Sequence, residues 1–394
     1  MSKSNIIVAF GGVSPEHEVS VLTAMQVLAA FEDSAYQTIP LYISKSGQWF
    51  TGDVLRDLKK YKDLSKLTSS ADTCVFTRLE DGRPVLKTIT SGFFNRSDEF
   101  PVYAVLPAFH GSAGENGSFQ GICETYNMPY CGSGVMGSAI GMNKVVTKQL
   151  CGAAGIPVVD GIDFTESRWI DNRDQILSDI DALGEASVVK PVNLGSSIGV
   201  EIVKNLDEAE TAIETAFRYD SHLLVEKAIS PLVEINCSVL GTPEDNKVSV
   251  CERPMGSEEL LSFADKYQQE EGAKGMASAD REIPADIPKE LAENIQSTAK
   301  KVFSTIQASG LARLDFLVKA DTNEFYFNEI NTIPGSFSFY LWKENGLSFN
   351  NLLEELVDIA ISQHQKKNGR VQSYETNLLS QKAVKGMKGL KRSK

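Results

Sequence analysis

The chain has 394 residues, of which 42% are hydrophobic and 23% charged, and this balance is typical of a soluble globular protein with two or three domains. Its net charge of −13 at pH 7 argues against general nucleic-acid binding, because a polyanion would be repelled at long range. The sequence shows no signal-peptide pattern and no apolar run of membrane-spanning length, so we expect a cytoplasmic protein with no membrane span and with its six cysteines reduced.

The N-terminus has the pattern that opens an α/β domain. A short apolar strand over residues 5–10 leads into a glycine turn and then into a helix over residues 19–31. Ser14 or Glu16 could cap this helix. A ligand carboxylate could also lie at the helix start, and the residues themselves leave both interpretations open.

The next stretch, residues 44–100, is polar and irregular, which predicts an insertion with weak strands and no chemistry. Residues 101–108 then form an apolar, buried parallel strand that runs into a glycine-rich loop. Ligands bind open α/β sheets at such strand ends, so His110 in this loop is a candidate for holding a substrate carboxylate. We assign residues 1–143 to this substrate-binding domain.

A second unit, residues 144–240, contains a glycine- and serine-rich loop. An apolar strand ends at Lys190, and the loop 191–200 follows it. Backbone N–H groups and hydroxyls of such a loop can surround phosphates, and Lys190 could pair with one of them. The alternative is an ordinary hairpin whose lysine reaches solvent. Further strands are expected over residues 222–227 and 231–240.

A third unit, residues 241–368, contains a predicted hairpin with a polar turn at residues 321–323. An antiparallel pairing centred on Thr322 sets Asp315 opposite Glu329. The pairing brings four polar side chains to one face: Arg313, Asp315, Glu329 and Asn331. The other face takes the core side chains: Leu314, Phe316, Val318, Tyr326 and Ile330. Amphipathic helices are expected over residues 290–307 and 347–364, and a basic, disordered tail over residues 369–394.

The polar face of this hairpin is unfavourable by itself. Two carboxylates about 5 Å apart repel each other by roughly 3 kcal/mol at an effective dielectric constant of about 20. Mg²⁺ accepts carboxylate and amide oxygens together with phosphate oxygens, so Asp315, Glu329 and Asn331 are predicted to be its ligands. The alternative is that Arg313 only neutralises the two acids on a solvated sheet face.

Six motifs, taken together and in this order, resemble the ATP-grasp superfamily and, more closely, the D-alanine–D-alanine ligase family. They are GGVSPEHEVS, HGSAGENGSFQG, GMNK, VVKPVNLGSSIGV, LLVEK and RLDF…FNEINTIPG. The resemblance runs from about residue 5 to 355 and leaves residues 44–100 and the tail outside. It implies an α/β protein in which an N-terminal doubly wound parallel-sheet domain precedes two ATP-grasp subdomains of α+β type, with the nucleotide between their sheets.

The resemblance also implies roles for individual residues. The residues that match the ATP site are Lys144, Lys190, Ser197, Glu226, Lys227, Ile229, Glu234 and Lys266. The residues that match the catalytic groups are Glu16, Ser196, Tyr267, Arg313 and the amide of Gly335. The residues that match the substrate contacts are His110, Tyr340 and Leu341. The family's metal ligands match Asp315, Glu329 and Asn331, and two Mg²⁺ or Mn²⁺ ions are expected.

The implied reaction joins two D-alanines for peptidoglycan precursor synthesis, with ATP converting the first one into D-alanyl phosphate; a homodimer is expected. Two positions depart from the family pattern: Tyr340 replaces a serine that holds the second substrate, and Asn116 replaces an acid. A ligase that uses D-serine or D-lactate therefore stays open, although Tyr267 favours an amino acid. A catalytically retired ATP-binding regulator is the other alternative, and the intact polar face of the hairpin argues against it.

Overall fold

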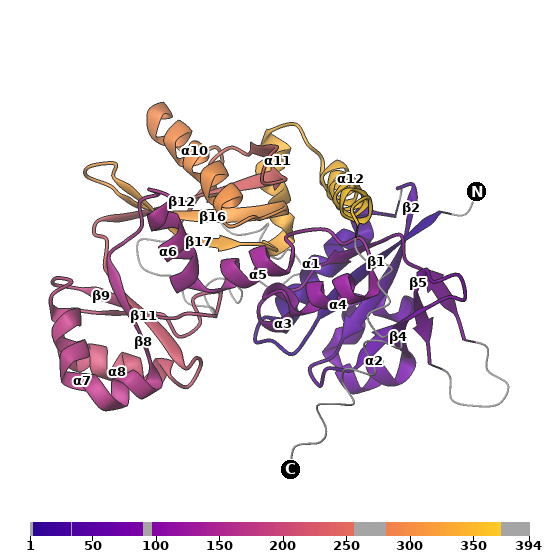
Figure 1. Ribbon diagram of the computed structural model, residues 1–394, viewed down its shortest axis with the longest axis horizontal. Coiled ribbons are helices and arrows are strands. Elements are labelled where there is room, and N and C mark those ends of the chain that lie inside the picture. The colour runs from indigo at the N-terminus through magenta and orange to yellow at the C-terminus, as the bar shows by residue number, and fades with distance from the viewer. Residues whose placement is uncertain (1–2, 33, 90–96, 256–280, 372–394) are drawn as a thin grey trace, which may run out of the picture.

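The computed structural model describes residues 3–32, 34–89, 97–255 and 281–371. Their strands form three large sheets and one two-stranded ribbon. Figure 1 shows the N-terminal sheet at one end of the molecule and the other two sheets, one above the other, at the opposite end. In the described part of the chain, no helix is both long and apolar enough to cross a membrane.

The N-terminal sheet has seven strands in the order β6-β5-β4-β3-β2-β1-β7. Their bounds are β1 Ser4–Gly11, β2 Tyr36–Ile43, β3 Trp49–Thr51, β4 Asp72–Arg78, β5 Pro84–Thr88, β6 Glu99–Pro101 and β7 Ala104–Pro107. The strands β2, β1 and β7 pair in parallel, as predicted, whereas the other pairs are antiparallel. Residues 44–100 thus extend the sheet rather than forming an irregular insertion. The three-residue strands β3 and β6 are too short to show a hydrophobic period.

Helices cover both faces of this sheet. These are α1 His17–Ala30 and α2 Leu64–Ser70 on one face and α4 Ser118–Tyr126 on the other; the four-residue α3 Ser112–Glu115 precedes α4, and α5 Val135–Met142 packs against the third sheet instead. Alternate residues of β1 enter two different cores, with Ile6 and Val8 on the side of α1 and Ile7 and Ala9 on the side of Phe119 in α4. A central parallel strand that is buried on both faces reads as a continuous apolar run, and this is why the sequence predicts β1 well.

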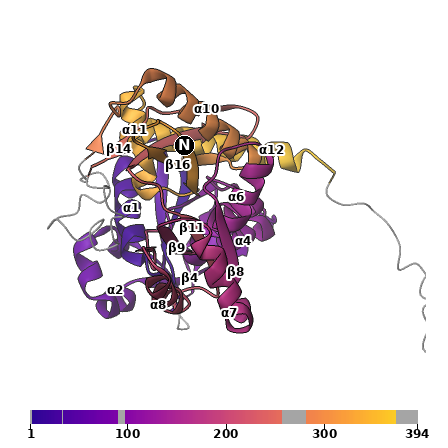
Figure 2. The ribbon, with the colours of Figure 1, turned by 90° about the vertical axis from the view of Figure 1, so that its left-hand side faces the viewer.

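The second sheet is antiparallel, with the order β10-β9-β11-β8. Its strands are β8 Gly161–Thr165, β9 Ser187–Pro191, β10 Glu201–Val203 and β11 His222–Lys227. The helices α7 Glu166–Asp181 and α8 Leu206–Ala216 bury apolar side chains against one face. The helix α6 Lys144–Ala153 precedes this sheet, and Asn143 caps it through its side chain. Figure 2 shows α7 and α8 at the end of the molecule opposite α10.

The third sheet has the order β13-β12-β16-β17. Its strands are β12 Leu232–Gly241, β13 Asn246–Val248, β16 Gly310–Lys319 and β17 Phe325–Asn331, and β14 Arg253–Pro254 pairs with β15 Arg281–Glu282 beside it. The remaining elements are α10 Lys289–Thr305, the 3-10 turn η4 Gly335–Ser338, α11 Phe339–Glu344 and α12 Phe349–Asn368. The inner strand β12 is buried from Ile235 onward, because α10 covers one face and Trp342 packs on the other.

The predicted pairing of the hairpin is confirmed near the strand ends that carry the polar residues. Asp315 lies opposite Glu329, and Arg313 lies opposite Asn331. A β-bulge then shifts the register, so that Phe316 lies opposite Phe327. The extra residue moves Phe327 into the core, where it is fully buried, whereas Tyr326 is only half-buried. The prediction of Tyr326 as a core residue is therefore wrong.

One hydrophobic core joins the N-terminal sheet to the C-terminal elements. It contains residues of β1 and α1 together with Leu311 of β16, Phe337 of η4, Trp342 of α11 and residues of α12. Because these side chains pack in a common core, the N-terminal loops are held at a fixed position beside the third sheet.

The start of β16 offers a direct test of this packing. Gly310 has a φ of +72°, and a Cβ atom there would lie 2.6 Å from the Cα of Gly132. Gly310→Ala should therefore lower the free energy of unfolding by at least about 2 kcal/mol. The matched control is Gly121→Ala in α4, where an added Cβ meets nothing within 4 Å; this change should be neutral or stabilise by up to about 1 kcal/mol. Urea unfolding measures the free energy of unfolding of each variant. Equal stabilities for the two variants would contradict the close packing of Gly310 against Gly132.

Candidate active site

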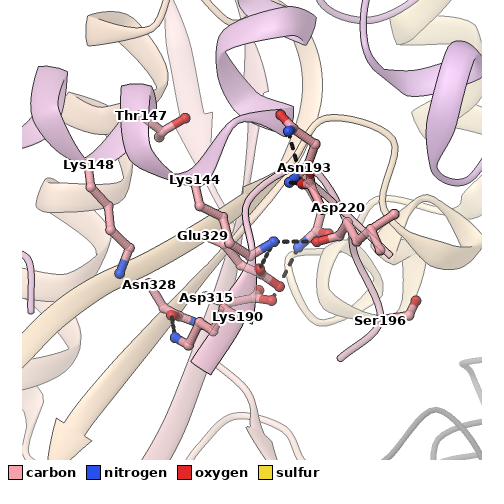
Figure 3. A network of polar contacts seen from close by, with 12 residues as sticks. Lys144, Thr147, Lys148, Lys190, Asn193, Ser196, Asp220, Asp315, Asn328 and Glu329 are labelled. Carbon is pink, nitrogen blue, oxygen red and sulfur yellow. Dashed lines mark hydrogen bonds and ion pairs between the residues drawn. The ribbon is translucent and has the colours of Figure 1, made fainter. Parts of the chain in front are cut away.

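Lysines of α6 and β9 reach across to the third sheet. The Nζ of Lys144 lies 3.3 Å from Oε2 of Glu329 and also donates to the carbonyl of Leu194. The Nζ of Lys190 donates to Oδ1 of Asn328 at 3.1 Å. Figure 3 shows these side chains directed toward one another from separate elements. The two predicted phosphate-binding lysines therefore face the acidic end of the hairpin.

The bulge in β17 contributes to this arrangement. It leaves Asn328 as the extra residue between Phe327 and Glu329, and β17 thereby directs two consecutive polar side chains at the lysines. Asn328 is a contact that sequence reasoning missed, because strict alternation would have turned it away from Glu329. Bulges re-aim side chains in this way near binding sites.

Arg313 and Asp315 form a bidentate ion pair. The Nε of Arg313 lies 2.7 Å from Oδ1 of Asp315, and one terminal nitrogen lies 2.7 Å from Oδ2. Burial alone would lower the pKa of Arg313, but the charge of Asp315 raises that pKa well above its ordinary value. The amide of Asn331 also donates to Asp315, at 3.2 Å. The alternative in which Arg313 neutralises both acids therefore holds for Asp315 only, because Glu329 pairs with Lys144.

The polar face of the hairpin fits a hard divalent cation. Among the described residues, no three His, Cys, Asp or Glu side chains form a cluster that could hold a metal by themselves. The donor set here is two opposed carboxylates and one amide: Asp315, Glu329 and Asn331. Mg²⁺ is held in proteins by one or two carboxylates together with phosphate oxygens, so this set is suitable when a nucleotide supplies the remaining ligands.

Three segments meet at Glu16, which is 7% exposed. The Oγ of Ser196 donates to Oε1 of Glu16, and a Cβ atom at Gly111 would lie 2.4 Å from Oε2. A side chain at this position would displace the Glu16 carboxylate, and the φ of +68° at Gly111 also favours glycine. Glu16 makes no side-chain bond to the helix start, so its interpretation as a cap is wrong. Ser14 instead accepts from the backbone N–H of Glu16 at 3.1 Å.

His110 lies in the loop that follows strand β7, and its side chain contacts Thr23 of α1. Its Nε2 lies 2.9 Å from Oγ1 of Thr23, and this Oγ1 accepts from the backbone N–H of Ser336 at 3.3 Å. Burial, and then the charge of Arg313, lower the pKa of His110 to about 4. The imidazole is therefore neutral near pH 7. Thr23 was missed by sequence reasoning, because it stands in a helix that reads as apolar.

Glu115, in the same glycine-rich loop, links two segments of the chain. Its carboxylate accepts from the backbone N–H groups of Gly111 at 2.9 Å and Ile333 at 3.4 Å. Burial, and then the charge of Glu16, raise its pKa to about 7. Sequence reasoning missed this role; the signal that could have found it is an acid inside a glycine-rich loop at a strand end.

Tyr340 and Leu341 are both buried in α11. The hydroxyl of Tyr340 donates to Oε1 of Glu252 at 3.3 Å. Arg281 lies 2.7 Å from Oε2 of Glu252 and stacks over the Tyr340 ring, with its guanidinium carbon 4.1 Å from the ring centre. Burial and the charge of Glu252 raise the pKa of Tyr340. No local pattern predicts this cluster, because its members come from three separate segments.

The remaining predicted residues come from the second sheet, the third sheet and the turn η4. Glu226 is 1% exposed and points at two lysines, whereas the next residue, Lys227, is exposed. Half-buried positions are Ile229, Glu234 and Ser197, and the φ of Ser197 is +57°. Gly335 begins η4, beside the site. Lys266 and Tyr267 lie outside the described residues.

Comparison with known proteins gives a consistent result along the chain. Residues 5–133 match the family model described as D-ala D-ala ligase N-terminus, and residues 150–358 match D-ala D-ala ligase C-terminus. The first model spans residues 44–100 as well, so the expectation that this segment falls outside the resemblance is wrong.

Named relatives agree with the family models. A D-alanine–D-alanine ligase of Thermosipho melanesiensis is 37% identical over 381 residues, covering 97% of this chain and 99% of its own. One of Enterococcus faecalis is 36% identical over 362 residues, covering 91% and 99%.

Solved structures resemble the fold over its whole length. The D-alanine–D-alanine ligase of Coxiella burnetii superposes with a TM-score of 0.77 at 29% identity and covers all of both chains. The VanG D-Ala:D-Ser ligase of Enterococcus faecalis gives 0.74 at 28% identity, covering 91% of this chain and 100% of that one.

The burial of His110 predicts a specific dependence of stability on pH. Its pKa is about 4 in the folded protein and 6.5 as the ordinary value, so between these values the unfolded chain binds more protons. The stability associated with neutral His110 is present above pH 6.5 and lost as the pH falls toward 4. Relative to His110→Gln, the wild type should lose up to about 1.4 kcal/mol per pH unit in this window. Urea unfolding across this range measures the difference, and a flat difference would contradict the burial of the ring.

Proposed function

The chain belongs to the D-alanine–D-alanine ligase family, and from that premise we propose how its own residues carry out the reaction. The protein is an ATP-dependent carbon–nitrogen ligase that joins two D-alanines for peptidoglycan precursor synthesis. The resemblance inferred from the six motifs is therefore confirmed. The observation that supports the site best is the approach of Lys144 and Lys190 to the polar end of the hairpin.

ATP binds between the second and third sheets in this proposal. Lys144 and Lys190 hold the phosphates, together with Ser197 of the glycine- and serine-rich loop. The adenine lies against the segment from Glu226 to Ile229, and Glu234 binds the ribose. Lys266, outside the described residues, would complete the site from its loop.

The metal site of the proposal is the polar face of the hairpin. Asp315, Glu329 and Asn331 would hold Mg²⁺ or Mn²⁺, with two ions expected. The cation would supply neutralising charge to the phosphates of ATP. Lys144 pairs with Glu329 in the structure, and we propose that it transfers to a phosphate oxygen when nucleotide binds.

In the first step, a carboxylate oxygen of the first D-alanine attacks the γ-phosphorus of ATP. The bond to the bridging oxygen breaks, and D-alanyl phosphate and ADP result. Glu16, with Ser196 and Tyr267, would hold the amino group of this substrate. The neutral His110 would face its carboxylate and donate a hydrogen bond without adding charge.

In the second step, the amine of the second D-alanine attacks the carbonyl carbon of the acyl phosphate. The carbonyl oxygen becomes an oxyanion, which Arg313 and the backbone N–H of Gly335 would stabilise. Collapse of this intermediate expels phosphate, and the new amide nitrogen loses its proton. The pair of Arg313 with Asp315 fixes the guanidinium on the hairpin for this purpose.

Tyr340 and Leu341 would form the wall of the second-substrate site. The hydroxyl of Tyr340 is directed at Glu252, and Arg281 lies beside it, so the wall carries a fixed charge pair rather than the serine of the family pattern. Family membership and the named relatives do not favour D-serine, D-lactate or a retired regulator. Because the reaction consumes ATP and D-alanine, we place it in the cytoplasm; the homodimer stays a prediction.

Product analysis tests the function and the metal site together. Wild-type protein incubated with ATP, Mg²⁺ and a mixture of D-alanine, D-serine and D-lactate should yield D-alanyl-D-alanine by mass spectrometry. Glu329→Gln should reduce product formation by at least about 100-fold, because it removes a charged ligand from the phosphate-binding face.

The matched control is Glu324→Gln, an exposed acid of the same hairpin, which should leave the rate unchanged. A product made mainly from D-serine or D-lactate would overturn the substrate assignment. Full activity of Glu329→Gln would overturn the metal assignment instead.

Tyr340→Phe tests the second-substrate wall. Loss of the hydroxyl removes one hydrogen bond to Glu252, whose net contribution is about 1 kcal/mol, so KM for the second D-alanine should change about fivefold. KM for ATP should stay the same. The control is Tyr130→Phe, which removes a hydroxyl that donates to Glu124 at 2.8 Å outside the site. If only the KM for ATP changed, the assignment of Tyr340 to the wall of the second-substrate site would be contradicted.

A further inference from the structure

A buried acid of the second sheet is shared by two lysines. Glu226 on β11 is 1% exposed, and its two carboxylate oxygens contact different cations. Oε1 accepts from the Nζ of Lys148 on α6, and Oε2 lies 2.7 Å from the Nζ of Lys190 on β9. Each lysine side chain is less than one-tenth exposed. Three elements therefore place one negative and two positive charges out of contact with bulk water.

The two lysines have different further contacts. Lys190 also donates to Asn328 on the third sheet, so it already faces the proposed nucleotide site. Lys148 stands one helical turn after Lys144, on the same face of α6, and its Nζ contacts Glu226. Figure 3 shows Lys144 and Lys148 projecting from the same helix, with Lys148 directed to the side where Lys190 meets Asn328 and Lys144 directed to Glu329.

The charges of this cluster are not balanced within it. Glu226 carries one negative charge, and its pKa falls to about 2 because the two lysines outweigh the effect of burial. Burial, opposed by Glu226 but assisted by the charge of Lys190, lowers the pKa of Lys148 to about 8. One cation is therefore in excess. Lys190 can therefore bind an anion that arrives beside Asn328, because Glu226 would keep its ion pair with Lys148.

We propose that Lys148 is a positioning residue for ATP: it neutralises Glu226, so that Lys190 can leave that carboxylate and pair with the nucleotide phosphates. The inference rests on the proposed assignment of Lys190 to the phosphates. Lys148 touches no substrate in this account and acts through Lys190. Without it, Lys190 would be the counter-ion of a buried acid, and phosphate would have to compete for it.

The test is a double-mutant cycle on Lys148 and Glu226. Lys148→Met leaves Glu226 to Lys190 alone, so the KM for ATP should rise about tenfold or more while the KM for D-alanine stays within twofold. In a Glu226→Gln background the carboxylate no longer competes, so adding Lys148→Met should change the KM for ATP by less than twofold. Lys148→Arg keeps the charge and should stay within about threefold of the wild type.

Direct titration of the same variants with a non-hydrolysable ATP analogue and Mg²⁺ measures dissociation constants for the nucleotide. These constants do not depend on the rate of the reaction. The control is Lys87→Met, which removes an ion-paired lysine of the N-terminal sheet and should leave both KM values unchanged. If Lys148→Met alone fails to fold, the double variant compared with Glu226→Gln still tests the proposal, because a rise in the KM for ATP there would overturn it.

An unchanged KM for ATP in Lys148→Met would overturn the proposal, and so would an equal rise in the Glu226→Gln background. The second result would mean that Lys148 acts on ATP without Glu226. Failure of the proposed function is seen separately, as a wild type that forms no D-alanyl-D-alanine.

Discussion

The structure of the site depends on the opposition of Asp315 and Glu329 on neighbouring strands. Two acids on directly opposed positions need cations, and the chain supplies them from two elements. Arg313 comes from the same strand as Asp315, whereas Lys144 comes from the helix before the second sheet. The second and third sheets are also linked directly, because Lys190 of β9 donates to Asn328 of β17. An ATP phosphate and a divalent cation would satisfy the same charges.

The N-terminal sheet contributes the other side of the site through two loops. The helix start at Glu16 and the glycine-rich loop at Gly111 approach so closely that a side chain on the glycine would clash. Glu115 then ties this loop to the backbone that leaves the hairpin, at Ile333. Since the N-terminal and C-terminal elements also share one hydrophobic core, packing at a distance from the candidate site helps to position its loops.

The sequence predicted those features that follow from local periodicity. The hairpin register near Asp315 came from strict alternation and a polar turn, and β1 came from a continuous apolar run. The bulge at Asn328 could not be predicted, because an extra residue in a strand leaves no mark on composition. Thr23 and Glu252 were missed because their partners are brought to them by tertiary folding. The roles taken from the family resemblance stay proposals, and Lys266 and Tyr267 lie outside the described residues.

The central claim is that the polar face of the hairpin binds the metal nucleotide. Crystals grown with Mn²⁺ and a non-hydrolysable ATP analogue would test it most directly, because Mn²⁺ has an anomalous scattering signal. The account predicts manganese peaks in contact with oxygens of Asp315, Glu329 and Asn331, with the analogue's phosphates beside Lys144 and Lys190. Manganese bound elsewhere, with Arg313 and Lys144 still holding the two acids, would contradict it.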